Sequence, residues 1–149
     1  MQVAKIKTGK ELFTEIAQIM QWYYNNAGTQ NDINRLLATQ DRLAALSYNL
    51  AATAGELKDE YNNSYYIRRV HQNKCKQAFI NAGDSIGKAT INAEADTKTE
   101  LREEAQAEAA SYKIDLMLRQ VNRVLQAMQQ RISHLKKEWE LSQNRSIGA

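Results

Sequence analysis

The chain has 149 residues, no proline and a net charge of only +3. Because proline breaks helix interiors, its absence favours a nearly all-helical protein, and the length suits one domain. A single cysteine, Cys75, excludes an intrachain disulfide and is typical of a reducing compartment. No signal peptide or membrane-spanning stretch is recognisable, so we expect a soluble cytoplasmic protein with no membrane partner.

The first predicted helix covers about residues 8–26. Thr8 and Glu11 have the spacing of a capping box, in which each side chain satisfies a free backbone amide of the first turn. Apolar residues then recur at helical intervals along one face. The amide-rich segment that ends in Gly28 is typical of a helix stop.

A second, much longer helix is predicted over about residues 31–82. Asn31 and Asp32 are good caps for its start, and Gly55 interrupts its pattern without the need for a break. Gly83 and Gly87 follow within five residues of each other, so the helix must end or bend there. The simplest result is a hairpin of two antiparallel helices.

The next segment, residues 86–96, is compatible with either a short helix or an irregular lead-in. Thr97 and Glu100 form a second capping box, which predicts a third helix over about residues 97–142. Apolar residues in this helix alternate at intervals of four and three from Ile114 to Trp139. This heptad spacing is typical of a helix that lays a narrow seam against another helix.

Two interpretations of the seam stay open, and they are compatible with each other. The seam can close on the second helix of the same chain, or it can join subunits, and we expect a homo-oligomer. The predicted oligomer interface consists of Leu118, Val121, Leu125, Met128, Ile132, Leu135 and Trp139. The predicted fold is therefore all-α, in one domain over residues 1–149: a long helical hairpin with coiled-coil-like packing plus a shorter N-terminal helix.

Charge is unevenly spread along the chain. Residues 61–90 carry five basic and one acidic side chains, whereas residues 91–111 carry two basic and six acidic ones. Residues 112–149 are basic again, with seven basic and three acidic side chains. This separation predicts either an anionic partner or attraction between parts of neighbouring subunits.

Familiar catalytic and metal-binding patterns do not fit. The segment from Gly83 to Ala89 has only three residues between its glycines and no hydroxyl after Lys88, so it is not a nucleotide-binding phosphate loop. His71 and Cys75 lie one helical turn apart, but zinc needs more ligands than this pair supplies. We therefore expect no catalytic residues, no metal and no cofactor.

The most suggestive segment runs from Tyr61 to Phe79, where basic side chains alternate with aromatic rings and amides. Single-stranded nucleic acid is bound by this combination, since cations contact its backbone and flat rings stack on its bases. Tyrosines at helical spacing also pack core edges or subunit interfaces, which is the alternative interpretation. The predicted nucleic-acid-binding residues are Tyr65, Tyr66, Arg68, Arg69, Lys74, Lys76 and Lys88.

These features resemble the UvsY-like group of phage recombination mediators. The resemblance covers about the last ninety residues and rests on three segments: Tyr65-Tyr66-Ile67-Arg68-Arg69, Glu103-Glu104, and the amphipathic stretch from Ile132 to Glu138. It implies single-stranded DNA binding and ring-like assembly. It also implies loading of a RecA-type recombinase onto strands coated with single-strand binding protein.

We therefore predict a non-enzymatic, oligomeric accessory of recombination or replication that binds single-stranded DNA. The alternative is a helical scaffold, virion component or protein-binding inhibitor without a nucleic-acid role, because tyrosine and arginine are also favoured in protein interfaces.

Overall fold

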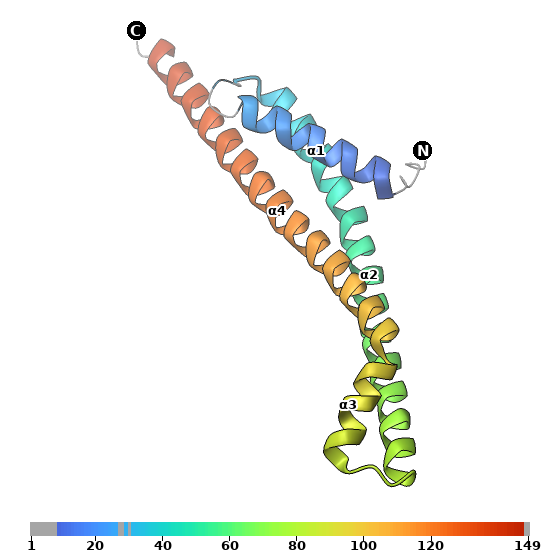
Figure 1. Cartoon of the computed structure of the whole chain (residues 1–149). Helices are drawn as coiled ribbons and strands as arrows, with labels where there is room; N and C mark the ends of the chain where they lie inside the picture. The colour runs from blue at the N-terminus through green and yellow to red at the C-terminus, as the bar shows by residue number, and fades with distance from the viewer. Residues whose placement is uncertain (1–8, 27–28, 30, 148–149) are drawn as a thin grey trace. The chain divides into compact units, whose positions relative to one another are not determined.

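The computed structural model describes residues 9–26, 29 and 31–147, and every regular element in them is a helix. The helices are α1 (Gly9–Asn26), α2 (Ile33–Asn81), α3 (Ile86–Asp96) and α4 (Lys98–Ile147), as labelled in Figure 1. The predicted all-α fold, with two long helices packed against each other and a shorter N-terminal helix, is confirmed. None of the helices in the described ranges is long and apolar enough to cross a membrane.

The chain divides into two compact units, and the single domain over residues 1–149 stays a prediction. Unit 1 comprises residues 1–53 and 116–149, and unit 2 comprises residues 54–115. Helices α2 and α4 each contribute one part to each unit, so unit 1 is assembled from two segments that are far apart in the sequence.

Unit 1 has a core of large apolar side chains from three helices. In one cluster, Ile132 and Leu135 of α4 are buried with Leu36 of α2, and Trp22 of α1 packs against them. Burying a leucine or isoleucine side chain stabilises a fold by about 1.5–3 kcal/mol. The core residues of the unit are Leu12, Ile16, Tyr23, Leu36, Leu43, Leu46, Leu50, Val121, Val124, Met128, Ile132 and Leu135.

Polar contacts at the edge of this core link α1 with α2 and α2 with α4. The Arg42 guanidinium donates to both carboxylate oxygens of Glu15, with 2.9 Å from Nη2 to Oε2. Gln40 of α2 donates to Gln129 of α4 at 2.9 Å. Because these pairs are exposed, they contribute little to the free energy of unfolding.

Helix α2 begins as its capping residue predicts. The Asp32 carboxylate accepts a hydrogen bond from the backbone N–H of Arg35 at 3.1 Å, and the Asp32 carbonyl accepts from Leu36. These bonds satisfy amides that have no partner within the helix. The capping box predicted for the first helix includes Thr8, which lies outside the described residues.

Helix α2 ends at a glycine-dependent turn. Gly83 has a φ of 99°, in the left-handed region where side chains are strained. The amides of Gly83 and Asp84 donate to the carbonyls of Ile80 and Phe79, the two bonds of a Schellman motif. Ser85 then caps α3 by accepting from the amide of Lys88 at 3.4 Å, so residues 86–96 form a helix rather than an irregular lead-in.

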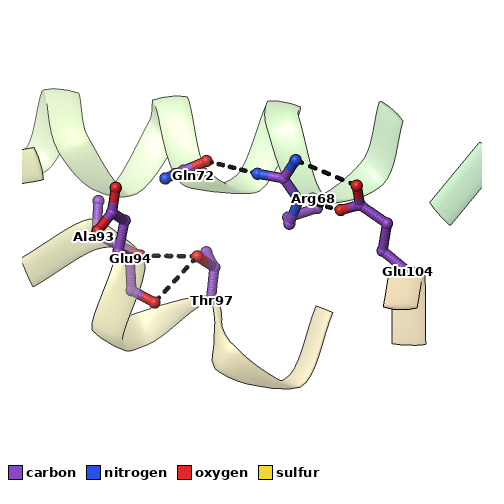
Figure 2. Close-up of polar contacts among 6 residues, drawn as sticks. All are labelled: Arg68, Gln72, Ala93, Glu94, Thr97 and Glu104. Carbon is purple, nitrogen blue, oxygen red and sulfur yellow. Dashed lines mark hydrogen bonds and ion pairs between the residues drawn. The ribbon is translucent and has the colours of Figure 1, made fainter. Parts of the chain in front are cut away.

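The capping box expected at Thr97 is replaced by a different contact. The Thr97 hydroxyl donates backward to the carbonyl of Ala93 at 2.9 Å, and its backbone amide bonds to the same carbonyl. The residue is buried at the junction of α3 and α4, where this bond ends α3 (Figure 2). A threonine followed by glutamate three residues on predicts a helix start, but here the hydroxyl satisfies the end of the preceding helix.

Unit 2 has a thin interior. The only large apolar side chain that is buried among its described residues is Ile114, at 6% exposed. The other buried positions are small or polar: Ala89, Ala93, Thr97, Glu104 and Ser111. Unit 2 therefore depends on half-buried apolar residues such as Phe79 and Ile80, on polar contacts and on the close approach of small residues.

Candidate nucleic-acid interface

The predicted nucleic-acid-binding residues lie mainly on the last turns of α2, within unit 2, but they point in different directions. Arg68 turns toward α4 (Figure 2), where its guanidinium bonds to both oxygens of the Glu104 carboxylate, one of them at 3.3 Å. It also donates to the Gln72 side chain on its own helix at 2.9 Å. The Arg68 and Glu104 side chains are only 16% and 11% exposed. The Arg68 cation therefore lies inside unit 2, where it pairs with Glu104.

The electrostatics of this pair favour the charged form of Arg68. The hydrogen bond with Glu104 is the main reason that the pKa of Arg68 lies above its usual value, and burial opposes it. A half-buried guanidinium with two carboxylate bonds and one amide bond has most of its donors satisfied. Arg68 therefore supports the helix pair, and phosphate would have to compete with Glu104 for it.

The Tyr65 ring contacts both neighbouring arginines, Arg68 and Arg69. The guanidinium carbons of Arg68 and Arg69 lie 5.5 and 5.8 Å from the centre of its ring. Cations at this distance are attracted by the ring electrons. Because two guanidinium groups already contact the Tyr65 ring, the residue is better placed to orient Arg69 than to stack on a base.

Tyr66 differs from Tyr65 because it is 67% exposed. At 3.6 residues per turn, the exposed residues three, four, seven and eleven positions away lie on the same side of α2. We call this surface the outer face of α2; it consists of Asn62, Tyr66, Arg69, Asn73 and Gln77. It combines one open ring, one cation and three amides.

The remaining predicted cations are distributed around this face. Lys74 is exposed and Lys76 is half-buried, on either side of the outer face of α2. Within the described ranges, no ion pair involves Arg69, Lys74 or Lys76. Lys88, in contrast, is on α3, where its ammonium lies 2.9 Å from Oδ1 of Asp84, so it does not extend the same track.

The carboxylates of Glu100 and Asp84 contact His71 and Lys88. The His71 imidazole contacts the Glu100 carboxylate, one helical turn before Glu104 on α4. The pKa of Glu100 is lowered first by a hydrogen bond to its own backbone and then by His71. The Asp84 pKa is lowered chiefly by the hydrogen bond from Lys88. These carboxylates are therefore acceptors for the basic segment of their own chain.

Glu100 and Glu104 are partners of the basic segment that the sequence patterns did not predict. Their signal was the charge separation between residues 61–90 and residues 91–111, which was attributed to an outside partner or to neighbouring subunits. The structure instead brings part of each segment together within unit 2, through the pairs of Arg68 with Glu104 and His71 with Glu100.

The predicted oligomer interface lies in unit 1, and most of it faces its own chain. Four of its residues are buried and two, Leu118 and Leu125, are half-buried, whereas Trp139 is 62% exposed. Val124, absent from the predicted seam, is also buried. The seam therefore has the intrachain role that the sequence left open, and its role between subunits stays a prediction. The four buried residues are Val121, Met128, Ile132 and Leu135.

Metal-ligating side chains do not converge anywhere in the described ranges: no group of three or more His, Cys, Asp or Glu residues is placed to hold an ion. Cys75 is half-buried and reduced. No protein-family model, curated protein or solved structure matches the chain, so the inference of function depends on the side chains described above.

Proposed function

We propose that the chain binds single-stranded DNA through the outer face of α2 and acts as a non-enzymatic accessory of phage-type recombination or replication in the cytoplasm. One observation carries the proposal: Tyr66 is 67% exposed on the same face as Arg69, a guanidinium with no ion pair in the described part of the chain. A ring for base stacking and a cation for the backbone are the two components that sequence-tolerant strand binding needs.

The arrangement refines the set of contact residues. Tyr66 stacks on a base, and Arg69, Lys74 and Lys76 contact phosphates. Tyr65 positions the Arg69 guanidinium, whose carbon lies 5.8 Å from the ring centre. Few cations are available per chain, so binding is weak for one copy and gains strength from several copies on one strand. A recombinase or single-strand binding protein on the same strand is the partner class that the sequence resemblance implies.

The test is fluorescence anisotropy with a labelled oligothymidine strand over a series of salt concentrations. Affinity should fall as salt rises, because phosphate contacts release counterions. Tyr66→Ala should weaken binding about tenfold, since a stacked base contributes about 1–3 kcal/mol. Tyr48→Ala is the matched control, because Tyr48 is a tyrosine on the same helix that is 79% exposed in unit 1.

Three results would contradict the proposal: no measurable binding, an affinity independent of salt, or equal effects of the two tyrosine substitutions. A double substitution of Arg69 and Lys74 by alanine should flatten the salt dependence, whereas Arg119→Ala on α4 should leave it unchanged. An equal salt dependence of affinity in these variants would contradict the assignment of the phosphate contacts to Arg69 and Lys74.

A protein-binding role without nucleic acid is the second candidate, and exposed apolar side chains favour it. In unit 2, Ile86 and Ile91 of α3 are 69% and 68% exposed. Exposed apolar groups of this kind are typical of surfaces that contact other proteins. Absence of strand binding together with a stable assembly in light scattering would support this role as a scaffold, virion component or inhibitor.

A further inference from the structure

Helix α4 carries an exposed apolar stripe on the side that faces away from the interior of unit 2. We call Leu101, Ala105, Ala109 and Tyr112 the α4 stripe. At 3.6 residues per turn they fall within a sector roughly 80° wide. Leu101 and Tyr112 are 52% and 62% exposed, and both alanines are exposed. Ile114, which is buried, lies on the opposite side of the helix, and the buried residues Glu104 and Ser111 lie between it and the stripe.

Charged residues border the stripe with opposite signs on its two edges. Arg102 and Lys113 follow one edge, and Glu108 and Asp115 follow the other, as helical spacing places them. All four are exposed, and no ion pair involves them in the described residues. A helix with one basic and one acidic edge is complementary to another copy of itself.

The direction of pairing follows from these edges. In a parallel pair the two helices are related by a twofold axis along their length, so the basic edge of one meets the acidic edge of the other. Glu108 and Lys113 are five positions apart, which is the spacing of the charge pairs that flank a parallel coiled coil. In an antiparallel pair like edges would meet, and like charges repel.

We propose that two copies of the chain associate through the α4 stripe, with their α4 helices parallel over residues 101–113. The two alanines let the backbones approach closely, and Tyr112 supplies the largest contact. A second copy would cover Leu101 and Tyr112, which are 52% and 62% exposed in the single chain, and this gives the association a physical reason. Farther along α4 the same face carries Leu116, which is 39% exposed, and then Arg119 and Arg123, whose charges end the apolar stripe.

The first experiment is sedimentation equilibrium of the full chain over a range of concentrations. The wild type should dimerise or assemble further, and the double variant Leu101→Glu with Tyr112→Glu should raise the dissociation constant at least tenfold. Tyr48→Glu is the matched control, because Tyr48 is 79% exposed on α2 and lies outside the stripe. Circular dichroism should show unchanged helix content in both variants, since all three positions are exposed.

The second experiment tests the direction of pairing. In a Cys75→Ala background, Ala109→Cys should form a disulfide between chains under mild oxidation. A parallel pair places position 109 opposite itself, whereas an antiparallel pair over residues 101–113 places it opposite position 105. Glu103→Cys, exposed on another side of α4, should remain a thiol. A monomeric wild type, stripe variants that assemble like the wild type, or equal cross-linking at positions 103 and 109 would each overturn the proposal.

Discussion

The pair formed by Arg68 and Glu104 makes a quantitative prediction about the stability of unit 2. Replacing Glu104 by alanine removes both carboxylate oxygens from a guanidinium that is only 16% exposed. Hydrogen bonds to charged groups contribute about 1.5–3 kcal/mol each, and solvent access at the edge of the pair reduces this. Because Gln72 still accepts from Arg68 at 2.9 Å, we expect a loss of about 2 kcal/mol.

A double-mutant cycle separates the pair from its surroundings. Arg68→Ala, Glu104→Ala and the double variant should be compared with the wild type by urea unfolding followed by circular dichroism. The coupling free energy should be about 1–2 kcal/mol, typical of residues in direct contact. At exposed pairs such as Arg42 with Glu15, where the arginine side chain is 46% exposed, the same cycle should give less than about 1 kcal/mol.

The cycle also bears on the proposed nucleic-acid contact. If Arg68 stabilises the pairing of α2 with α4, Arg68→Ala should lower the free energy of unfolding more than Arg69→Ala does. It should also weaken binding to the strand less than Arg69→Ala does. A coupling free energy near zero, or an affinity loss confined to Arg68→Ala, would refute the assignment of Arg68 to the helix pair.

Substitutions at single positions test three other features of the fold. Gly83→Ala should destabilise by about 1 kcal/mol because its φ is positive, whereas Gly55→Ala, with open space around its added methyl, should stabilise α2 by a similar amount in thermal unfolding. Leu43→Ala should cost about 2–5 kcal/mol in urea unfolding because Leu43 is fully buried, and Tyr48→Ala should cost less than about 0.5 kcal/mol. Because the pKa of Asp84 is lowered in the folded chain, its pair with Lys88 contributes to the free energy of unfolding above about pH 4, the ordinary carboxyl range. This contribution is lost as the pH falls below that range. The Asp84→Asn variant should therefore lose less stability than the wild type during acid titration, and equal losses would refute the assignment.

Local signals in the sequence predicted the helices well because they depend on nearby residues. The Asp32 cap and the Gly83 turn act within a few positions, and both lie where the sequence indicates. Contacts between distant residues could not be predicted in the same way. The burial of Glu104 depends on Arg68, thirty-six positions earlier, and no local pattern links the two.

The heptad seam illustrates the same limit. Its spacing predicted one narrow line of contact, but α4 packs on both α1 and α2 in unit 1, which widens the buried side to include Val124. Trp139 is exposed because residues 136–146 are not covered by another element of the described chain. The amount of a helix that is covered depends on the lengths of its neighbours, which the heptad pattern does not encode.

The division of unit 1 into two distant segments affects the order in which the chain folds. Residues 54–115 must either remain a flexible loop or already be structured when the two segments of unit 1 meet. A hairpin formed by local contacts brings its ends together early, and this removes most of the entropy cost of closing such a loop. Substitutions at the Gly83 turn should therefore slow the formation of a core that contains no residue from the turn itself.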